Sequence, residues 1–386
     1  MSRHRIVPAL LILLLSLVLP VSADKKKKNT DEEGMIPEVS TKPQKKKKED
    51  EMTQTLPPPK EPPAAVVAET DRLFFQVSPL SSKGLLSQQT RDAMRTLLRS
   101  SHGTNIVKLR AFVAGSGDMR RIQEIAGEVF GEKHLALPAI SVVQAGALPM
   151  EGAQVVIESI GVDRRTINPN GVAFVSGQAT DSIEQSLDRL KLALQAGGME
   201  SQDVLRVTCF VSSLEASRSG RSALDSIFPS AAINVVQMQR LPVKPGSECE
   251  GVARLRSAPA NAVEFLNPNG LDRSPNYTQL TLVRAPKVVF SGTQLGFGSQ
   301  DADIKLAFER LQRAIGGVNA KLDKLAMSHV YLTSMAIADR IRQIRKNFYN
   351  AGNPPASTML PFEGLPSLDA SFGVDVVAIP EAANAN

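Results

Sequence analysis

Residues 138–144 of this 386-residue chain read PAISVVQ, and the same pattern of small, apolar and polar residues occurs twice more. It returns as AAINVVQ at residues 231–237 and as PASTMLP at residues 355–361, and a Leu-Pro pair follows each copy. Self-similarity along a chain is the signature of a copied supersecondary unit. The sequence therefore predicts a tandem array of three copies rather than one large domain.

Each copy carries similar elements ahead of this pattern. In the second copy, residues 172–175 predict a strand that leads into Ser-Gly-Gln and then into a helix whose apolar residues recur at helical spacing. The third copy repeats this arrangement from residue 288 onward, and the first, from Leu73, has Gln-Val-Ser where the others have the glycine turn. Stretches rich in β-forming residues follow at residues 107–113, 204–211 and 325–332, and second helices are expected at residues 119–130, 215–228 and 337–348.

Each copy is thus predicted to contain two strands, a helix, a strand, a second helix and two further strands, which makes the fold class α+β. A unit of this size can hold one hydrophobic core. A single sheet with helices on one side, however, leaves its other apolar face uncovered. We expect three such faces to cover one another.

Together these residues resemble the Rid family, the reactive intermediate deaminases that are also called YjgF-like proteins. The Ser-Gly-Gln turn, the Pro-Ala-x-Ser/Thr segment and the Leu-Pro-x-Gly-Ala turn are that family's signposts, and they come in the family's order over residues 70–163, 166–256 and 274–380. Members typically have a chorismate-mutase-like fold and form homotrimers round a central axis, with ligand clefts between neighbours. The resemblance implies that this chain is an intramolecular pseudo-trimer of three tandem repeats and a monomer in solution.

The N-terminal region predicts export. Residues 1–23 combine a basic start, an apolar run and a small-residue cleavage site, as a secretory signal peptide does. The apolar run is shorter than the about 20 residues that a membrane span needs, although an uncleaved anchor stays open as an alternative. Residues 24–68, rich in Lys, Glu and Pro, are predicted to be a disordered linker. We assign the repeats to residues 69–163, 164–257 and 272–381, and expect a secreted or periplasmic protein without a transmembrane segment after cleavage.

The content of charged residues, cysteine and histidine excludes several classes of function for this protein. Residues 63–386 contain 33 basic and 30 acidic residues without a concentrated basic stripe, so no specific nucleic-acid binding is expected. The lysine runs of the linker are either a solvated spacer or a contact with an anionic surface. Cys209 and Cys249 either pair in an oxidising compartment or remain buried thiols. No histidine or cysteine has the spacing of metal ligands, so neither a metal nor a cofactor is expected.

The residue that grips the substrate in active Rid deaminases is missing from all three copies. Those enzymes have an arginine directly after Pro-Ala, whose guanidinium binds the substrate carboxylate through two parallel hydrogen bonds. The resemblance assigns this position to Ile140, Ile233 and Ser357. None of these side chains can supply a charged bidentate donor.

The same enzymes have a carboxylate in the last strand that positions the attacking water. The resemblance assigns this position to Glu158 in the first copy, to Val252 in the second and to Asp375, one methylene shorter, in the third. With Ile140 as its neighbour, Glu158 is interpreted as a structural residue. The sites of the first two copies are therefore predicted to be degenerate.

The third copy retains more of the family's polar residues. Residues 274–279 read SPNYTQ and resemble the Gly-Pro-Tyr-Ser-Gln segment that supplies the family's cleft tyrosine. The predicted ligand-binding residues are therefore Tyr277, Ser291, Gly292, Ser357 and Asp375. Asp375 and Tyr277 are also the candidate catalytic residues, with a solvated strand end and a packing residue as their alternative roles.

The sequence thus predicts an exported Rid-like protein that binds a small metabolite in an inter-repeat cleft, without arginine-dependent imine deaminase activity. One alternative is a divergent enamine or imine deaminase, or another hydrolase, that uses Asp375 and Tyr277. Another is a non-catalytic scaffold ring. The polar residues of the third copy favour binding over a scaffold.

Overall fold

The computed structural model describes residues 60–102, 104–115, 117–240 and 246–381. The predicted signal peptide and residues 24–59 of the predicted linker lie outside these ranges. Within them, no helix combines the length and the apolarity that crossing a membrane requires.

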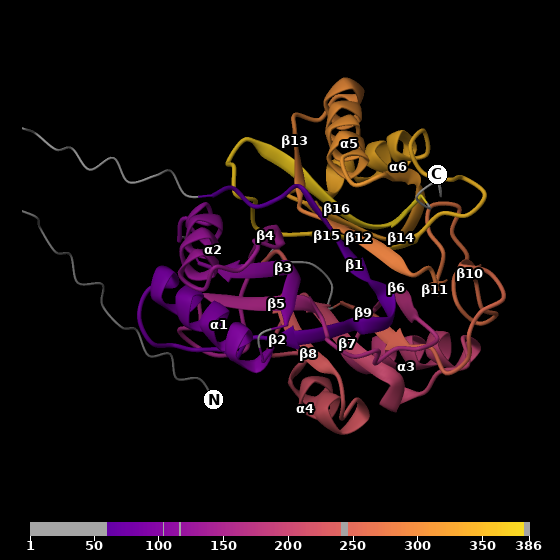
Figure 1. Cartoon of the computed structure of the whole chain (residues 1–386), viewed down its shortest axis with the longest axis horizontal. Coiled ribbons are helices and arrows are strands. Elements are labelled where there is room, and N and C mark those ends of the chain that lie inside the picture. The colour runs from indigo at the N-terminus through magenta and orange to yellow at the C-terminus, as the bar shows by residue number, and fades with distance from the viewer. Residues whose placement is uncertain (1–59, 103, 116, 241–245, 382–386) are drawn as a thin grey trace, which may run out of the picture. The chain divides into compact units, whose positions relative to one another are not determined.

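Three mixed sheets with helices on their outer faces make up the described chain, which confirms the α+β prediction (Figure 1). The first sheet, in the order β2-β5-β3-β4, contains β2 (Leu73–Val77), β3 (Asn105–Ala114), β4 (Ala139–Ala145) and β5 (Val155–Val162). The second, in the order β10-β11-β6-β9-β7-β8, contains β6 (Val172–Thr180), β7 (Val204–Val211), β8 (Ala232–Gln237), β9 (Ser247–Arg254), β10 (Val263–Leu266) and β11 (Leu280–Val283). The third, in the order β1-β12-β16-β14-β15 with β13 also on β16, contains β1 (Ala65–Glu69), β12 (Lys287–Ser291), β13 (Gln294–Phe297), β14 (Ala320–Leu332), β15 (Ala356–Pro361) and β16 (Ala370–Pro380).

An arrangement of three strands recurs in the three sheets. The strand that follows the first helix pairs in parallel with the strand of the Pro-Ala pattern, as β3 with β4, β7 with β8 and β14 with β15. On its other side the same strand pairs antiparallel with the last strand, as β3 with β5, β7 with β9 and β14 with β16. Equivalent positions can therefore be identified from the register rather than from the sequence alone.

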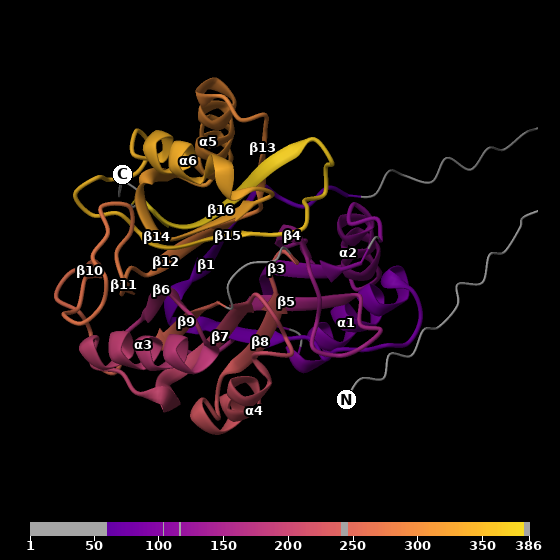
Figure 2. The ribbon, with the colours of Figure 1, turned by 180° about the vertical axis from the view of Figure 1, so that it is seen from behind.

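Two helices pack on the outer face of each sheet (Figure 2). They are α1 (Leu86–Ser100) and α2 (Arg121–Glu132), α3 (Ile183–Ala196) and α4 (Arg218–Ile227), and α5 (Asp301–Gly316) and α6 (Ala338–Arg345). The apolar stripe of each pair is buried against its own sheet, which gives three separate outer cores. The three second helices occur close to where the sequence predicts them.

The inner faces of the sheets pack against one another. Two further apolar clusters combine residues of all three sheets, and Phe112, Phe210 and Phe362 lie within ring-centroid distances of 5.8–6.1 Å of one another. Each inner face, which would be exposed on an isolated sheet, is therefore covered by its neighbours.

Two strands pair with a sheet other than the one that their place in the sequence suggests. Residues 65–68 of strand β1 belong to the stretch 24–68 that is predicted to be linker, yet β1 pairs antiparallel with β12 of the third sheet. The prediction is wrong for residues 65–68 because the short apolar run AVVA gains backbone partners on the third sheet. Similarly, β11 precedes β12 in the chain but pairs with β6 of the second sheet.

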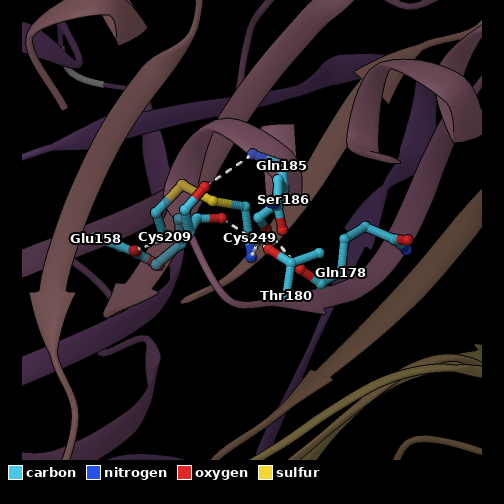
Figure 3. The surroundings of a disulfide bond; sticks show 9 residues. Glu158, Gln178, Thr180, Gln185, Ser186, Cys209 and Cys249 are labelled. Atoms are coloured by element: carbon cyan, nitrogen blue, oxygen red, sulfur yellow. Dashed lines mark hydrogen bonds between the residues drawn. A yellow bond between two sulfur atoms is a disulfide. The ribbon is translucent and has the colours of Figure 1, made fainter. Parts of the chain in front are cut away.

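The two cysteines form a disulfide between β7 and β9, which decides between the two alternatives left open by the sequence (Figure 3). Cys209 and Cys249 are fully buried and directly opposite in the antiparallel register. The backbone N–H of Cys249 donates to Ser186 Oγ of α3 at 2.8 Å. The disulfide therefore lies on the helix side of the second sheet and fixes the register of β9.

Candidate functional site

The inner faces of the sheets carry a buried group of charged residues, here called the axial cluster. Its members are Lys108 and Arg110 on β3, Glu158 on β5, Arg206 on β7, Glu250 on β9, His329 on β14 and Asp375 on β16. Burying an ionised side chain is costly unless partners compensate its charge. The contacts within this cluster therefore matter for the stability of all three sheets.

The register of the last strands corrects one predicted site position. Glu158 lies opposite Arg110 and Asp375 opposite His329, and the corresponding residue of the second sheet is Glu250, opposite Thr208. The assignment to Val252 is therefore wrong by two residues. Strand β9 begins at Ser247 of the Gly-Ser pair, which pairs with Val211, whereas β5 begins two residues after the Gly-Ala pair, at Val155, which pairs with the equivalent Val113. Val252 itself pairs with Phe174 in the apolar cluster.

Asp375 is buried and bonded to four side chains, so it is not a solvated strand end. Its carboxylate accepts hydrogen bonds from Ser141 Oγ, from Lys108 Nζ at 3.3 Å and from Tyr331 Oη at 3.0 Å, and it contacts His329 Nδ1 at 2.9 Å. Burial alone would raise the pKa of Asp375, but the Lys108 ammonium and His329 hold it well below its ordinary value. It is therefore a permanent anion whose oxygens are already engaged.

Glu158 has partners that the sequence did not reveal. Its carboxylate lies 2.6 Å from Arg110 Nη2 and accepts hydrogen bonds from Thr208 Oγ1 at 2.7 Å and from Asn234 Nδ2 at 2.8 Å. Thr208 and Asn234 belong to the second sheet, so the partners of Glu158 do not depend on the neighbouring Ile140. Ile140 faces the helix-side core of the first sheet.

Glu250 of the second sheet likewise contacts residues of the first and third sheets. Its Oε1 accepts from Arg110 Nη2 at 2.7 Å and from Arg206 Nη2 at 3.0 Å, and it lies 3.3 Å from His329 Nε2. The three carboxylates thus each contact a neighbouring sheet. Ion pairs across all three sheets hold the axial cluster together.

Ser291 and Gly292 meet the first sheet. The Ser291 carbonyl accepts from Lys108 Nζ at 2.5 Å, and Ser291 Oγ accepts from the N–H of Val376. Gly292 donates to the carbonyl of Ala64, and a side chain there would come within 3.1 Å of the Ile140 carbonyl oxygen. Both positions therefore serve the packing of the third sheet against the first.

Tyr277 and Ser357 lie elsewhere, where the third sheet meets the second. The N–H of Ser357 donates to Ser176 Oγ at 2.8 Å, so the Ser-Gly turn beside it is that of the second copy. The structure therefore divides the predicted ligand-binding residues between two places. Asp375 belongs to the axial cluster and Ser291 contacts Lys108 of that cluster, whereas Tyr277 and Ser357 lie at this junction.

An arginine that sequence analysis did not select reaches the junction. Arg345, in the last turn of α6, donates from Nη1 to Ser357 Oγ at 3.2 Å and from Nη2 to the Asn276 carbonyl at 2.7 Å. It is 3% exposed, its Nε has no partner, and among the described residues no carboxylate pairs with it. Burial lowers the pKa of Arg345. A guanidinium thus stands beside the position where the Rid motif would carry its arginine.

A carboxyl group with a perturbed pKa completes the junction. Glu248 on β9 lies directly against Gly177, so closely that a side chain at Gly177 would collide with its carboxylate. Burial, and then the charge of Glu250, raise the pKa of Glu248 to about 8. The pKa of Tyr277 is also raised, by burial and by the charge of Glu248. We call Gly177, Glu248, Tyr277, Arg345 and Ser357 the junction site.

Two residues of the junction site, Arg345 and Glu248, were not selected by sequence analysis because no motif marks them. Arg345 lies on a helix, far along the chain from the Pro-Ala motif, and only packing brings it to Ser357. Glu248 is two residues before Glu250, and alternate residues of a strand share a face. That spacing would have identified it, had the register of the second copy been known.

Comparison with known proteins gives limited matches. No family model and no curated protein matches the chain. Among solved structures, a member of the YjgF protein family from Neisseria meningitidis is 13% identical, with 31% of this chain and 97% of that chain covered and a TM-score of 0.24. A Rid-family protein of unknown function from Yersinia pestis is 14% identical, with 31% and 99% covered and a TM-score of 0.28. A putative endoribonuclease L-PSP from Entamoeba histolytica is 17% identical, with 30% and 98% covered and a TM-score of 0.22.

Proposed function

We propose that this chain is an exported Rid-like pseudo-trimer that binds a small carboxylate-bearing metabolite at the junction site. The residue patterns that resemble the Rid family and the strand arrangement that recurs in the three sheets support this proposal. The ligand class follows from the chemistry of the junction site rather than from that resemblance.

The observation that carries the proposal is the buried, unpaired guanidinium of Arg345. An uncompensated buried charge costs several kcal/mol, and a carboxylate is the counter-ion that matches the two-pronged geometry of arginine. The Nε of Arg345 has no partner, and Tyr277 and Asn276 beside it are only partly buried. A ligand carboxylate that enters past the loop of Asn276 and Tyr277 would supply the missing charge.

The test is binding of pyruvate, the simplest 2-keto acid, to the purified chain and to Arg345→Met, measured by calorimetry and ligand-observed NMR. Removing one partner of a buried charge pair costs about 2–5 kcal/mol, so we expect affinity to fall at least about thirtyfold. Arg340→Met, on the same helix but exposed, is the matched control and should bind like the parent chain. Arg345→Met also loses the hydrogen bonds to Ser357 and Asn276, so urea unfolding of the variant checks that it is folded before its affinity is compared.

Equal binding of pyruvate by the parent chain and Arg345→Met would refute the role of Arg345. If neither pyruvate nor any other small carboxylate binds the parent chain, the scaffold alternative replaces the proposal.

Glu248 favours a second candidate function, hydrolysis of an enamine or imine. A carboxyl group with a pKa of about 8 is mostly protonated at neutral pH and can donate a proton to a departing nitrogen. Asp375, by contrast, has its oxygens engaged and keeps a depressed pKa. If the chain is a deaminase, turnover of 2-aminoacrylate should fall as pH rises through about 8, and Glu248→Gln should abolish it. Turnover that persists in Glu248→Gln would exclude this mechanism.

A further inference from the structure

Within the described residues, the first sheet lacks an edge strand that both other sheets have. In the second sheet β11 pairs antiparallel with the outer edge of β6, and in the third sheet β1 pairs in the same way with β12. The corresponding strand of the first sheet is β2, which among these residues pairs only with β5. Each added strand comes from the segment just ahead of a repeat, but the short segment 163–171 between β5 and β6 forms no strand.

Three phenylalanines at equivalent register positions show the effect of this difference. Phe75, Phe174 and Phe290 each lie opposite the residue two positions after the last-strand carboxylate of their own sheet. Phe174 also pairs with β11 and Phe290 with β1, and both are at most 2% exposed. Phe75, which is paired on one side only in the described chain, is partly exposed. An apolar side chain that packs on the inner core is therefore accessible at the edge of β2.

The neighbouring sheet shows the same difference. Strand β8 packs beside β2 as β15 packs beside β6. Residues 355–357 at the start of β15 are all buried, and Ala356 forms a bridge with Thr278, just ahead of β11. Residues 231–233 at the start of β8 are only partly buried. A strand on the outer edge of β2 would therefore cover Phe75 and the start of β8 together.

Backbone groups of β2 face this open edge. Ser78, directly after β2, donates its N–H to a carbonyl of β5. Alternate residues of an antiparallel strand bond to opposite sides, so Leu73, Phe75 and Val77 direct their N–H and C=O groups away from β5. Asn168 Nδ2 donates to the Leu73 carbonyl at 2.8 Å, which leaves Phe75 and Val77 as the residues that a further strand can pair with.

The equivalent N–H groups of the other sheets are bonded to the added strands. Val77, Ser176 and Gly292 each lie two residues after the equivalent phenylalanine. The N–H of Ser176 donates to the Gln279 carbonyl ahead of β11, and the N–H of Gly292 donates to the Ala64 carbonyl ahead of β1. The N–H of Val77 occupies the same position on β2.

We propose that the outer edge of β2 binds an extended aliphatic segment of another protein as an added antiparallel strand. Strands β11 (LTLV) and β1 (AVVAE) hold this position in the other sheets and define what fits. The residues that they set beside the inner phenylalanine are Thr281 and Val66, both small and β-branched. Residues 24–59 of this chain, rich in Lys, Glu and Pro, have a composition that disfavours strands, so we assign the segment to a partner. The surface shares no residue with the junction site.

The first test uses a fluorescein-labelled peptide that copies residues 278–285 (TQLTLVRA), with binding to the full chain followed by fluorescence anisotropy. We expect saturable binding. In β11 the N–H of Thr281 faces β6, so the same peptide with an N-methyl group on this threonine should bind about tenfold more weakly, the loss of one hydrogen bond. Absence of saturable binding, or equal binding of both peptides, would overturn the proposal.

A proline variant locates the bound peptide. Val77→Pro removes an N–H that faces away from β5, a position where an edge strand tolerates proline, and should weaken binding at least about tenfold. Val67→Pro is the matched control, because the N–H of Val67 likewise faces away from β12 at the edge of the third sheet. Urea unfolding checks that both variants are folded. Equal binding by Val77→Pro and the parent chain, or a loss confined to Val67→Pro, would place the peptide elsewhere and refute the assignment to β2.

Hydrogen exchange, measured by mass spectrometry on fragments that contain β2, β6 and β12, tests the open edge without a mutation. In the full chain the amides of residues 75–77 should exchange at least about tenfold faster than those of residues 174–176 and 290–292, and the peptide should slow them. Equally slow exchange in all three fragments without peptide would show that a second copy or the chain's own N-terminal residues already cover β2, and would overturn the proposal.

Discussion

Replacing Glu248 by glutamine should stabilise the protein at alkaline pH and leave its stability nearly unchanged at acidic pH. In the folded chain the pKa of Glu248 is raised from 4.5 to about 8, by burial and by the charge of Glu250. Between these two pH values the folded state keeps a proton that the unfolded chain has released. Stability therefore falls as pH rises through this range, since the unfolded state binds fewer protons.

The size of the effect follows from the pKa difference. At about 1.4 kcal/mol per pH unit, the upper limit is about 5 kcal/mol. Glu248 is only partly buried, so solvent screens its charge and we expect about 2 kcal/mol. Glutamine resembles the protonated acid and never ionises. The free energy of unfolding of Glu248→Gln should therefore match that of the parent chain near pH 4.5 and exceed it by about 2 kcal/mol near pH 9.

The assay is urea unfolding of the oxidised full chain, followed by circular dichroism at about pH 5, 7 and 9. Glu215→Gln is the control, because the Glu215 side chain is 84% exposed and should change stability by less than about 0.5 kcal/mol at every pH. If the difference between Glu248→Gln and the parent chain does not grow with pH, Glu248 is ionised in the folded protein and our reasoning is refuted.

Three further perturbations test the architecture. Arg110→Met removes the cation that two buried carboxylates share and should lower the free energy of unfolding by about 3–5 kcal/mol; a loss below 1 kcal/mol would contradict the ion pairing. Reducing the Cys209–Cys249 disulfide, which closes a sequence separation of 40 residues, should cost about 4 kcal/mol in the same assay, and identical melts with and without reductant would show that the bond is not formed. Removing residues 1–69 should unpair the edge of β12 and lower stability relative to a chain that begins at residue 60, whereas equal stability would mean that β1 contributes nothing. Light scattering should show a monomer of the mature chain, and a stable trimer would contradict the proposed pseudo-trimer.

The sequence by itself determined the local elements. Apolar residues at helical spacing predict the first and second helices, and the second helix expected at residues 119–130 is found as Arg121–Glu132. The recurring Pro-Ala pattern coincides with β4 and β15, and with β8 in its Ala-Ala form. These predictions succeed because periodicity and turn residues act over a few neighbours along the chain.

Pairing between distant strands could not be predicted in the same way. Strand β1 carries an ordinary apolar run, and nothing in its sequence states that its partner is β12, more than two hundred residues away. Similarly, the start of β9 at Ser247 moves the carboxylate position from Val252 to Glu250, and only the register with β7 reveals it. A shift by one residue exchanges the two faces of a strand, so register depends on the whole sheet.

The candidate site depended most on tertiary structure. The sequence identified Tyr277 and Ser357 as polar residues, but Arg345 and Glu248, the charged members of the junction site, reach them from a helix and from another sheet. Sequence patterns report which side chains a strand or helix presents on one face. The burial of a side chain and the resulting shift of its pKa are decided only when faces from different sheets meet. They determine which of those side chains can bind a ligand or hold a proton.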